Sequence, residues 1–313
     1  MRLAQAITQY IELKQSMGAR FRAEQVILTA FAKAMGDIDC KQVHSDRLYS
    51  YLAGTGPVTR FFHRKHDALS GFYRFAIGRA YAVCSPLPTT LPAPSIRFRP
   101  YIYSRDELQR LVDVAAIQEH PRMKLQALTL RTLILVLYGA GLRLSEALHL
   151  KLTDALLHDS LLTIRGSKFY KTRLVPIGPH LTAVLSTYAE KRRHSARLGP
   201  DSFFFVTRDG ECITRQIAER SFDRLRNRAG VHRNDGARYQ PRLHDLRHSF
   251  AVHRLVSWYR QGADVQRLLP QLSTYLGHVH VASTQHYLTM TPELLHEASL
   301  RFELYAKGGS NRG

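Results

Sequence analysis

The stretch Tyr138-Gly-Ala-Gly-Leu-Arg-Leu-Ser-Glu146 decides the fold of this chain, because it marks the end of its most apolar segment. Leu128 to Tyr138 predicts a buried helix, and either Gly139 or Gly141 can end it. The end of that helix then directs the Arg143 side chain toward a candidate functional site, which the motifs described next also form.

Three further motifs follow in a set order. His244-Asp-Leu-Arg-His-Ser-Phe-Ala251 places a histidine and Arg247 one helical turn apart. Leu276-Gly-His278 comes next, and Ser283-Thr-Gln-His-Tyr-Leu288 places Tyr287 nine positions after that histidine. A lone His-x-x-Arg is common on solvated helix faces, whereas the whole ordered set is very improbable by accident. The motifs therefore indicate a single functional site.

A basic hairpin lies between the first two motifs. The segments Leu161 to Arg165 and Arg173 to Ile177 are short and apolar, and a basic turn separates them. This pattern is typical of a β-hairpin. Its tip carries Lys168.

Two of the arginines suit a phosphate site that works without a metal. Attack on a phosphodiester builds extra negative charge on the phosphoryl oxygens, and fixed cationic donors stabilise that transition state more than the ground state. A guanidinium matches phosphate oxygens with a rigid fork and keeps its proton at neutral pH. Arg143 and Arg247 fit this role.

The other residues suit a tyrosine nucleophile. The Tyr287 hydroxyl, with an ordinary pKa near 10, is mostly protonated at neutral pH, so it needs a positive field and a proton acceptor. His244 and His278 can supply these. The departing sugar oxygen needs a proton, which Lys168 can deliver from a flexible hairpin.

The ordered set resembles the tyrosine recombinase (phage-type integrase) family, closely over residues 104–290 and more loosely over the first hundred. The resemblance implies that one set of residues surrounds the scissile phosphate: Arg143, Lys168, His244, Arg247 and His278. It also implies that Tyr287 forms a 3′-phosphotyrosyl link and that Glu146, a recurrent acidic partner, supports the site.

The hairpin departs from the family pattern. Relatives usually carry Gly-Lys-Gly there, whereas this chain has Arg165-Gly-Ser-Lys-Phe-Tyr-Lys-Thr-Arg173. Counting back from Arg173-Leu-Val-Pro-Ile177 favours Lys168 as the catalytic lysine. Lys171 is the competing choice.

The sequence predicts a mainly α-helical protein of two domains with a small β-hairpin or sheet. Residues 1–84 have helical periodicity and resemble the family's helical DNA core-binding domain. Residues 85–103 are expected to form a proline-rich linker. Residues 104–290 form the expected catalytic domain, which opens with the capping box Ser104-Arg-Asp-Glu107.

Residues 291–313 are expected to form a C-terminal helix and tail. Thr291 can cap this helix, Pro292 suits its first position, and an apolar stripe follows with near-helical spacing. The stripe consists of Leu294, Leu295, Ala298 and Phe302. Relatives pass this segment to the next subunit, so the resemblance implies docking on a neighbouring subunit, with packing on its own domain as the alternative.

The composition agrees with a DNA partner. The 45 Lys and Arg residues against 25 Asp and Glu give a net charge of +20, which favours polyanions. Candidate contacts to DNA phosphates are Arg60, Arg64, Lys65, Arg74, Arg215, Arg220 and Arg224. The four in the first domain equally suit a solvated helix face.

Metal and cofactor sites are not expected. His244 and His248 have i, i+4 spacing, but there is no His-Glu-x-x-His motif, and Cys40, Cys84 and Cys212 are scattered. The apolar run from Thr132 to Ala140 is far shorter than the roughly 20 residues of a membrane span. We therefore expect no membrane association and a cytoplasmic, reduced location.

The resulting hypothesis is a site-specific DNA recombinase (integrase) that acts through a 3′-phosphotyrosyl intermediate without ATP or metal. Its expected partners are double-stranded DNA and further copies of itself in a synaptic tetramer on DNA. Two alternatives are a type IB topoisomerase-like enzyme and a non-catalytic DNA-binding accessory protein. The target sequence and any accessory factors are not indicated.

Overall fold

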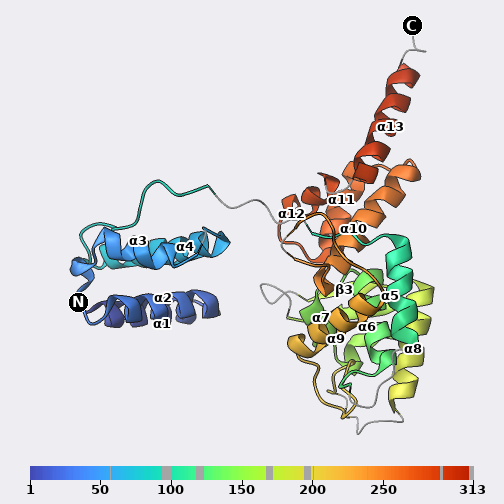
Figure 1. Cartoon of the computed structure of the whole chain (residues 1–313), viewed down its shortest axis with the longest axis horizontal. Coiled ribbons are helices and arrows are strands. Elements are labelled where there is room, and N and C mark those ends of the chain that lie inside the picture. The colour runs from blue at the N-terminus through green and yellow to red at the C-terminus, as the bar shows by residue number, and fades with distance from the viewer. Residues whose placement is uncertain are drawn as a thin grey trace. The chain divides into compact units, whose positions relative to one another are not determined.

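The chain divides into two compact units, Met1–Phe98 and Arg99–Gly313. The computed structural model describes residues 1–56, 58–93, 100–117, 123–166, 172–193, 199, 201–237, 239–289 and 292–309. The fold is mainly α-helical with one small sheet, as predicted (Figure 1). The dividing point falls within the range 85–103 that the sequence assigns to a linker.

The described part of the first unit contains four α-helices around one core. They are α1 (Leu3–Ser16), α2 (Arg22–Met35), α3 (Ser45–Ala53) and α4 (Arg60–Gly78), with a 3₁₀ turn η1 (Cys40–Gln42) between α2 and α3. Gly36 and Gly54 follow α2 and α3 with positive φ, a conformation that glycine adopts at little cost. The core is made of apolar helix faces, and its fully buried members include Leu28, Phe31, Leu48 and Phe72.

The second unit contains nine α-helices among its described residues. They are α5 (Arg105–Ile117), α6 (Ala127–Gly139), α7 (Leu144–Leu148), α8 (Pro179–Arg193), α9 (Arg215–Arg228), α10 (Leu243–Arg260), α11 (Val265–Leu276), α12 (Ala282–Gln285) and α13 (Pro292–Gly309). The predicted capping box at the start of α5 is present, because Glu107 N donates to Ser104 Oγ at 3.1 Å and Ser104 N to Glu107 Oε2 at 2.8 Å.

The sheet has three antiparallel strands in the order β1 (Ala155–Leu156), β2 (Leu161–Ile164) and β3 (Arg173–Pro176). Short 3₁₀ turns, η2 (Leu152–Asp154) and η3 (Leu157–Asp159), flank β1. Strands β2 and β3 pair with Ile164 opposite Arg173, which confirms the predicted hairpin. Residues 167–171 at its tip, including Lys168 and Lys171, lie outside the described residues.

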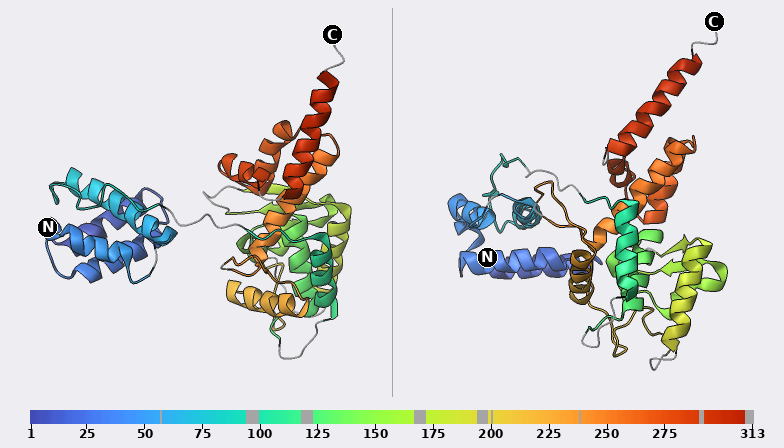
Figure 2. Two further views of the ribbon diagram at one scale, coloured as in Figure 1. Left: turned by 45° about the horizontal axis from the view of Figure 1, so that its top comes forward. Right: turned by 45° about the vertical axis from the view of Figure 1, so that its right-hand side comes forward.

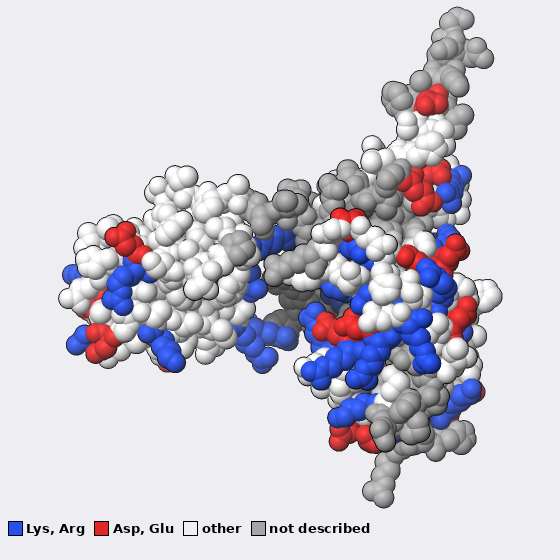
Figure 3. Space-filling view, in the orientation of Figure 1, with Lys and Arg blue, Asp and Glu red and all other residues white. Residues whose placement is uncertain are grey.

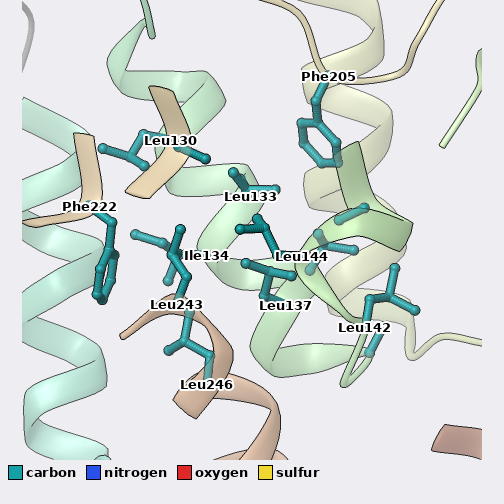
Figure 4. Close-up of a cluster of buried hydrophobic side chains, with 14 of the residues drawn as sticks. Leu130, Leu133, Ile134, Leu137, Leu142, Leu144, Phe205, Phe222, Leu243 and Leu246 are labelled. Atoms are coloured by element: carbon teal, nitrogen blue, oxygen red, sulfur yellow. The ribbon is translucent and has the colours of Figure 1, made fainter. Parts of the chain in front are cut away.

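Helix α6 lies at the centre of the second unit. The sequence predicts this helix over Leu128 to Tyr138, and the structure has it over Ala127–Gly139. Its leucines contact side chains from helices far along the chain, so that Phe222 of α9 and Leu243 and Leu246 of α10 gather against it (Figure 4). Most of its residues are buried, and a stripe of half-buried residues at helical spacing remains: Leu128, Arg131, Leu135 and Tyr138. Such a largely apolar helix is stable here because other elements cover most of its surface.

A second apolar cluster joins α10, α11 and the start of α13. Its buried members include Phe250, Leu276, Tyr287 and Leu294. The first turns of α13 also pair with α10, because Arg260 contacts Glu293 and Glu297 at 2.8 Å each. Further along, α13 projects away from the rest of the unit (Figure 2).

The expectation that the C-terminal helix docks on a neighbouring subunit rather than on its own domain is therefore wrong for its first turns. Leu294 is 1% exposed against its own unit, whereas Leu295 is 51% exposed. Thr291 lies outside the described residues, and the helix begins at Pro292. No helix among the described residues is long and apolar enough to cross a membrane.

We expect Leu294→Ala to destabilise the second unit by about 2–4 kcal/mol, because the substitution leaves a cavity in a packed cluster. The matched control Leu295→Ala should change the free energy of unfolding by less than about 0.5 kcal/mol. Trp258, the only tryptophan of the chain, adjoins this cluster, so its fluorescence during urea unfolding measures both changes. Equal effects of the two substitutions would contradict the docking described above.

Candidate active site

The ends of three α-helices and one 3₁₀ turn bring the motifs together. Arg143 precedes α7, and its neighbours Leu142 and Leu144 are buried in the core beside α6 (Figure 4). His244 and Arg247 lie in the first turns of α10. His278 follows the C-terminus of α11, and Tyr287 lies in the 3₁₀ turn η5 (His286–Thr289).

Backbone carbonyls at the ends of two helices hold Arg247. Its Nη1 donates to Gly141 O and its Nη2 to Leu276 O, both at 2.6 Å, and its side chain is 2% exposed. Burial, followed by the charge of Arg143, lowers the pKa of Arg247 to about 10, so the guanidinium stays charged at neutral pH. Gly141 must be glycine here, since its φ is +58° and a Cβ would lie 2.5 Å from the Phe250 ring.

Arg143 is also held by a backbone carbonyl, that of the residue which follows α11, and by a carboxylate. Its Nη2 donates to Gly277 O at 2.8 Å, and its Nη1 donates to Glu146 Oε1 at 2.7 Å. Its side chain keeps 27% of its surface exposed, whereas that of Glu146 keeps 6%. Arg143 is therefore more open to an incoming anion than Arg247.

Glu146 connects the arginines. Arg173, the first residue of β3, donates from Nη1 to Oε1 at 2.9 Å and from Nη2 to Oε2 at 2.8 Å, and Arg247 Nη1 lies 4.0 Å from Oε2. Burial raises the pKa of Glu146, but the hydrogen bonds and charge of Arg173 and Arg143 outweigh it and bring the value to about 2. Three guanidiniums around one carboxylate leave excess positive charge, which suits a bound anion.

The Tyr287 hydroxyl meets a histidine that the sequence analysis did not select for this site. His248 Nδ1 lies 3.1 Å from the hydroxyl, and Tyr287 is 3% exposed. Burial raises the pKa of Tyr287, while the charges of Arg247 and Arg143 act in the opposite direction. The sequence held one signal for His248: it follows Arg247 directly and lies one helical turn from His244.

His244 and His278 also adjoin this group. The His244 ring lies edge-on to His248 at 4.8 Å between ring centres, and the His278 ring is stacked near Tyr287 at 6.1 Å. His278 Nδ1 is 2.8 Å from Thr284 Oγ1. Burial is the main cause that lowers the pKa of His278 to about 4, so its ring is neutral at pH 7. Desolvation, followed by the charge of Arg247, also lowers the pKa of His244, although this residue keeps an exposed surface.

The basic residues predicted to contact phosphates differ in their surroundings. Arg60, Arg64 and Arg74 on α4 and Arg220 and Arg224 on α9 are exposed. Arg215 is also exposed and pairs with Glu219 at 2.7 Å. Lys and Arg side chains gather over α9 in Figure 3.

Two basic residues serve the fold. Lys65 donates to the carbonyls of Tyr51 and Leu52 at the end of α3, at 2.6 and 3.4 Å, and burial lowers its pKa. Arg226 of α9 is buried and donates to Val231 O at 3.2 Å. The charge of a residue in the sequence does not distinguish these structural roles from contacts with a ligand.

Comparisons with known proteins agree with this geometry. The profile of the phage integrase family matches residues 103–293. The chain is 37% identical over 307 residues to the integrase/recombinase y4rB of Sinorhizobium fredii, covering 96% of each chain. It is 31% identical to the tyrosine recombinase XerD of Bifidobacterium longum, covering 80% of this chain and 77% of the relative.

Solved structures share the fold at low sequence identity. The Tn1549 transposon integrase in complex with transposon right end DNA has a TM-score of 0.74 at 14% identity, covering 98% of this chain and 100% of that one. A lambda integrase dimer bound to a COC′ core site has a TM-score of 0.68 at 16% identity, covering 93% and 97%. The chain belongs to the phage integrase family. Within that family it is a tyrosine-type site-specific recombinase.

We expect Glu146→Gln to destabilise the second unit by about 3–5 kcal/mol at pH 7, because it leaves buried arginines without their carboxylate. The pKa of Glu146 falls from 4.5 to about 2 on folding, so its contribution is present above pH 4.5 and is lost as the pH falls through 2. Urea unfolding followed by Trp258 fluorescence should therefore show the two proteins converging by about 3 kcal/mol between pH 5 and pH 2.

The control for this measurement is Glu219→Gln, which removes a surface pair on α9 and should change the free energy of unfolding by less than about 1 kcal/mol. A Glu146→Gln protein as stable as the wild type at pH 7 would refute the role of this carboxylate.

Proposed function

We propose that Tyr287 is the nucleophile that attacks a DNA phosphodiester and forms a 3′-phosphotyrosyl link. The observation that carries this proposal is the position of the Tyr287 hydroxyl, 3.1 Å from a neutral imidazole and within the field of two buried or half-buried arginines. A partner strand's free 5′-hydroxyl then attacks the phosphotyrosine and reseals the DNA. The link conserves the energy of the broken bond, so no ATP or metal enters the reaction.

Arg143 and Arg247 bind the scissile phosphate in this proposal, and His244 and His278 complete its surroundings. Both arginines have nitrogens fixed on backbone carbonyls, so their orientation is set before a ligand arrives. Donors that are oriented in advance stabilise developing charge without reorganising during the reaction. Glu146 supports them by ionic contact and does not react.

Lys168, on the hairpin between β2 and β3, protonates the departing 5′-oxygen, and Lys171 is the competing residue. The rest of the chain holds DNA. Residues 1–84 form a core-binding domain, 85–103 a linker, 104–290 the catalytic domain and 291–313 the C-terminal helix and tail. Arg60, Arg64 and Arg74 on α4 and Arg215, Arg220 and Arg224 on α9 contact phosphates, and Lys65 does so only if it leaves the end of α3.

The partners are double-stranded DNA and three further copies of the chain. A lambda integrase tetramer bound to a Holliday junction has the same fold, with a TM-score of 0.66 at 17% identity. Relatives that match most of this chain are named as integrases or recombinases, which favours strand exchange over the relaxation carried out by a type IB topoisomerase. We place the reaction in the cytoplasm.

We expect Tyr287→Phe to abolish the covalent adduct while DNA affinity changes little, because the substitution removes the nucleophile and few phosphate contacts. The substrate is a nicked suicide duplex carrying the chain's recombination site, which sequencing of the DNA bound in cells identifies. Denaturing gels measure the adduct and native gels measure affinity.

The matched control is Tyr138→Phe. The Tyr138 hydroxyl also contacts a histidine, His253 Nδ1 at 2.9 Å, but lies outside the arginine group. This variant should form the adduct at the wild-type rate. An adduct with Tyr287→Phe would refute the assignment, and a wild type that binds the duplex without any adduct would favour the non-catalytic alternative.

Lys168→Ala should slow cleavage by about 100-fold or more, because the leaving oxygen loses its proton donor. A duplex with a bridging 5′-phosphorothiolate should restore the rate, since sulfur leaves without a proton. Lys171→Ala is the control and should cleave both duplexes at similar rates. Rescue of Lys171→Ala alone would assign the reaction to Lys171 instead.

A further inference from the structure

The contact between His248 and Tyr287 has no role among those that the sequence motifs imply. The two rings lie 5.5 Å apart between centres, and His248 Nδ1 is 3.1 Å from the hydroxyl. Both residues are largely withdrawn from water. In the tautomer with its hydrogen on Nε2, the His248 ring accepts a hydrogen bond from the tyrosine.

We propose that His248 is a catalytic residue that takes the proton from the Tyr287 hydroxyl during cleavage and returns it during resealing. This inference rests on the proposed role of Tyr287 as nucleophile. It assigns the proton acceptor to a residue other than His244 and His278, to which the sequence motifs point.

The three histidines differ in their hydrogen-bond partners and in the orientation of their rings relative to their neighbours. His278 Nδ1 is engaged with the Thr284 hydroxyl, and its ring is nearly parallel to that of Tyr287, at 23°. The His244 ring is perpendicular to that of His248. The Tyr287 hydroxyl is within hydrogen-bond distance of His248 Nδ1, which can accept its proton, whereas its other side-chain partner, Arg247, can only donate.

The surroundings keep His248 in its neutral form and, while no phosphate is bound, make it a weak base. Burial, followed by the nearby His244 and Arg247, lowers the pKa of His248 to about 3, and Arg242 and His278 act in the same direction. The ring is therefore neutral before DNA binds. A phosphate placed on Arg143 and Arg247 brings negative charge to the site, which opposes these cations and favours the imidazolium as the proton arrives.

Cleavage moves one proton from Tyr287 to His248 and one from the lysine to the departing oxygen. The Tyr287 O–H bond breaks, its proton moves to His248 Nδ1, and the phenolate oxygen forms a bond to phosphorus. The bond from phosphorus to the 5′-oxygen breaks, and the hairpin lysine protonates that oxygen. On resealing, the incoming 5′-hydroxyl returns its proton to the lysine, the phenolate leaves, and His248 gives its proton back to Tyr287.

The test compares His248→Gln and His248→Ala with the wild type, using the rate of adduct formation on the suicide duplex between pH 6 and 8. Glutamine can still accept a hydrogen bond and position the tyrosine, but it cannot take up a proton in this range. We expect cleavage by His248→Gln to be about 100-fold or more slower. Its rate should rise about tenfold per pH unit, because the tyrosine must ionise unaided, while the wild-type rate stays nearly flat.

Imidazoles added to His248→Ala provide the second measurement. If His248 transfers a proton, they should restore cleavage, and imidazoles of similar size but higher basicity should restore it more. His158→Ala, which removes a fully exposed histidine of the same unit, is the control and should respond to none of them. Trp258 fluorescence and native gels check that each variant folds and binds the duplex.

Two outcomes would overturn the proposal: cleavage by His248→Gln within a few fold of the wild type, or rescue of His248→Ala that is independent of imidazole basicity. Either would make His248 a positioning residue only. Adduct formation by the wild type and its loss in Tyr287→Phe would still support the nucleophile assignment, so a failure here is distinguishable from a failure of the proposed function.

Discussion

The buried carboxylate of Glu146 is the interaction on which the rest of the site depends. Two cations 4 Å apart repel by about 4 kcal/mol at the effective dielectric constant typical near a protein surface. Arg143, Arg173 and Arg247 could not lie together in a half-buried place without a counter-charge. Glu146 offsets part of this repulsion and leaves an excess of positive charge, which a phosphate can neutralise. The same carboxylate thus assembles the arginines and keeps the site selective for an anion.

Helix ends supply the rest of the support. The carbonyls of Gly141, Leu276 and Gly277 lie just after α6 or at the end of α11, where backbone acceptors have no partner within the helix. Arg247 bridges two elements that are far apart in the sequence, and Arg173 adds the base of the hairpin through Tyr275 O at 3.0 Å. Movement of one element therefore disturbs the others.

Local patterns in the sequence were sufficient to predict much of the fold. Apolar periodicity defines α6 to within one residue at each end, and the box at Ser104 and the paired segments of the hairpin were also found where expected. These features depend on neighbours in the chain. The motif residues Arg143 and Arg247 could be selected in the same way, because each stands in a distinctive string.

Contacts between distant elements could not be predicted. Arg173 looked like the start of a strand, and only the folded chain shows its bidentate contact with Glu146. His248 looked like half of a rejected metal pair. Lys65 was grouped with exposed cations by its charge, although its ammonium lies on the carbonyls that end α3. The burial of Tyr287 could not be predicted from the sequence either. Tyr287 packs with Phe250, Leu276 and Leu294. This burial holds its ring in place but makes its phenolate less stable. A tyrosine buried in this way can ionise at neutral pH only if cations and a neutral proton acceptor are fixed beside its oxygen, which is why the arginines, the imidazole and the apolar cluster must occur together.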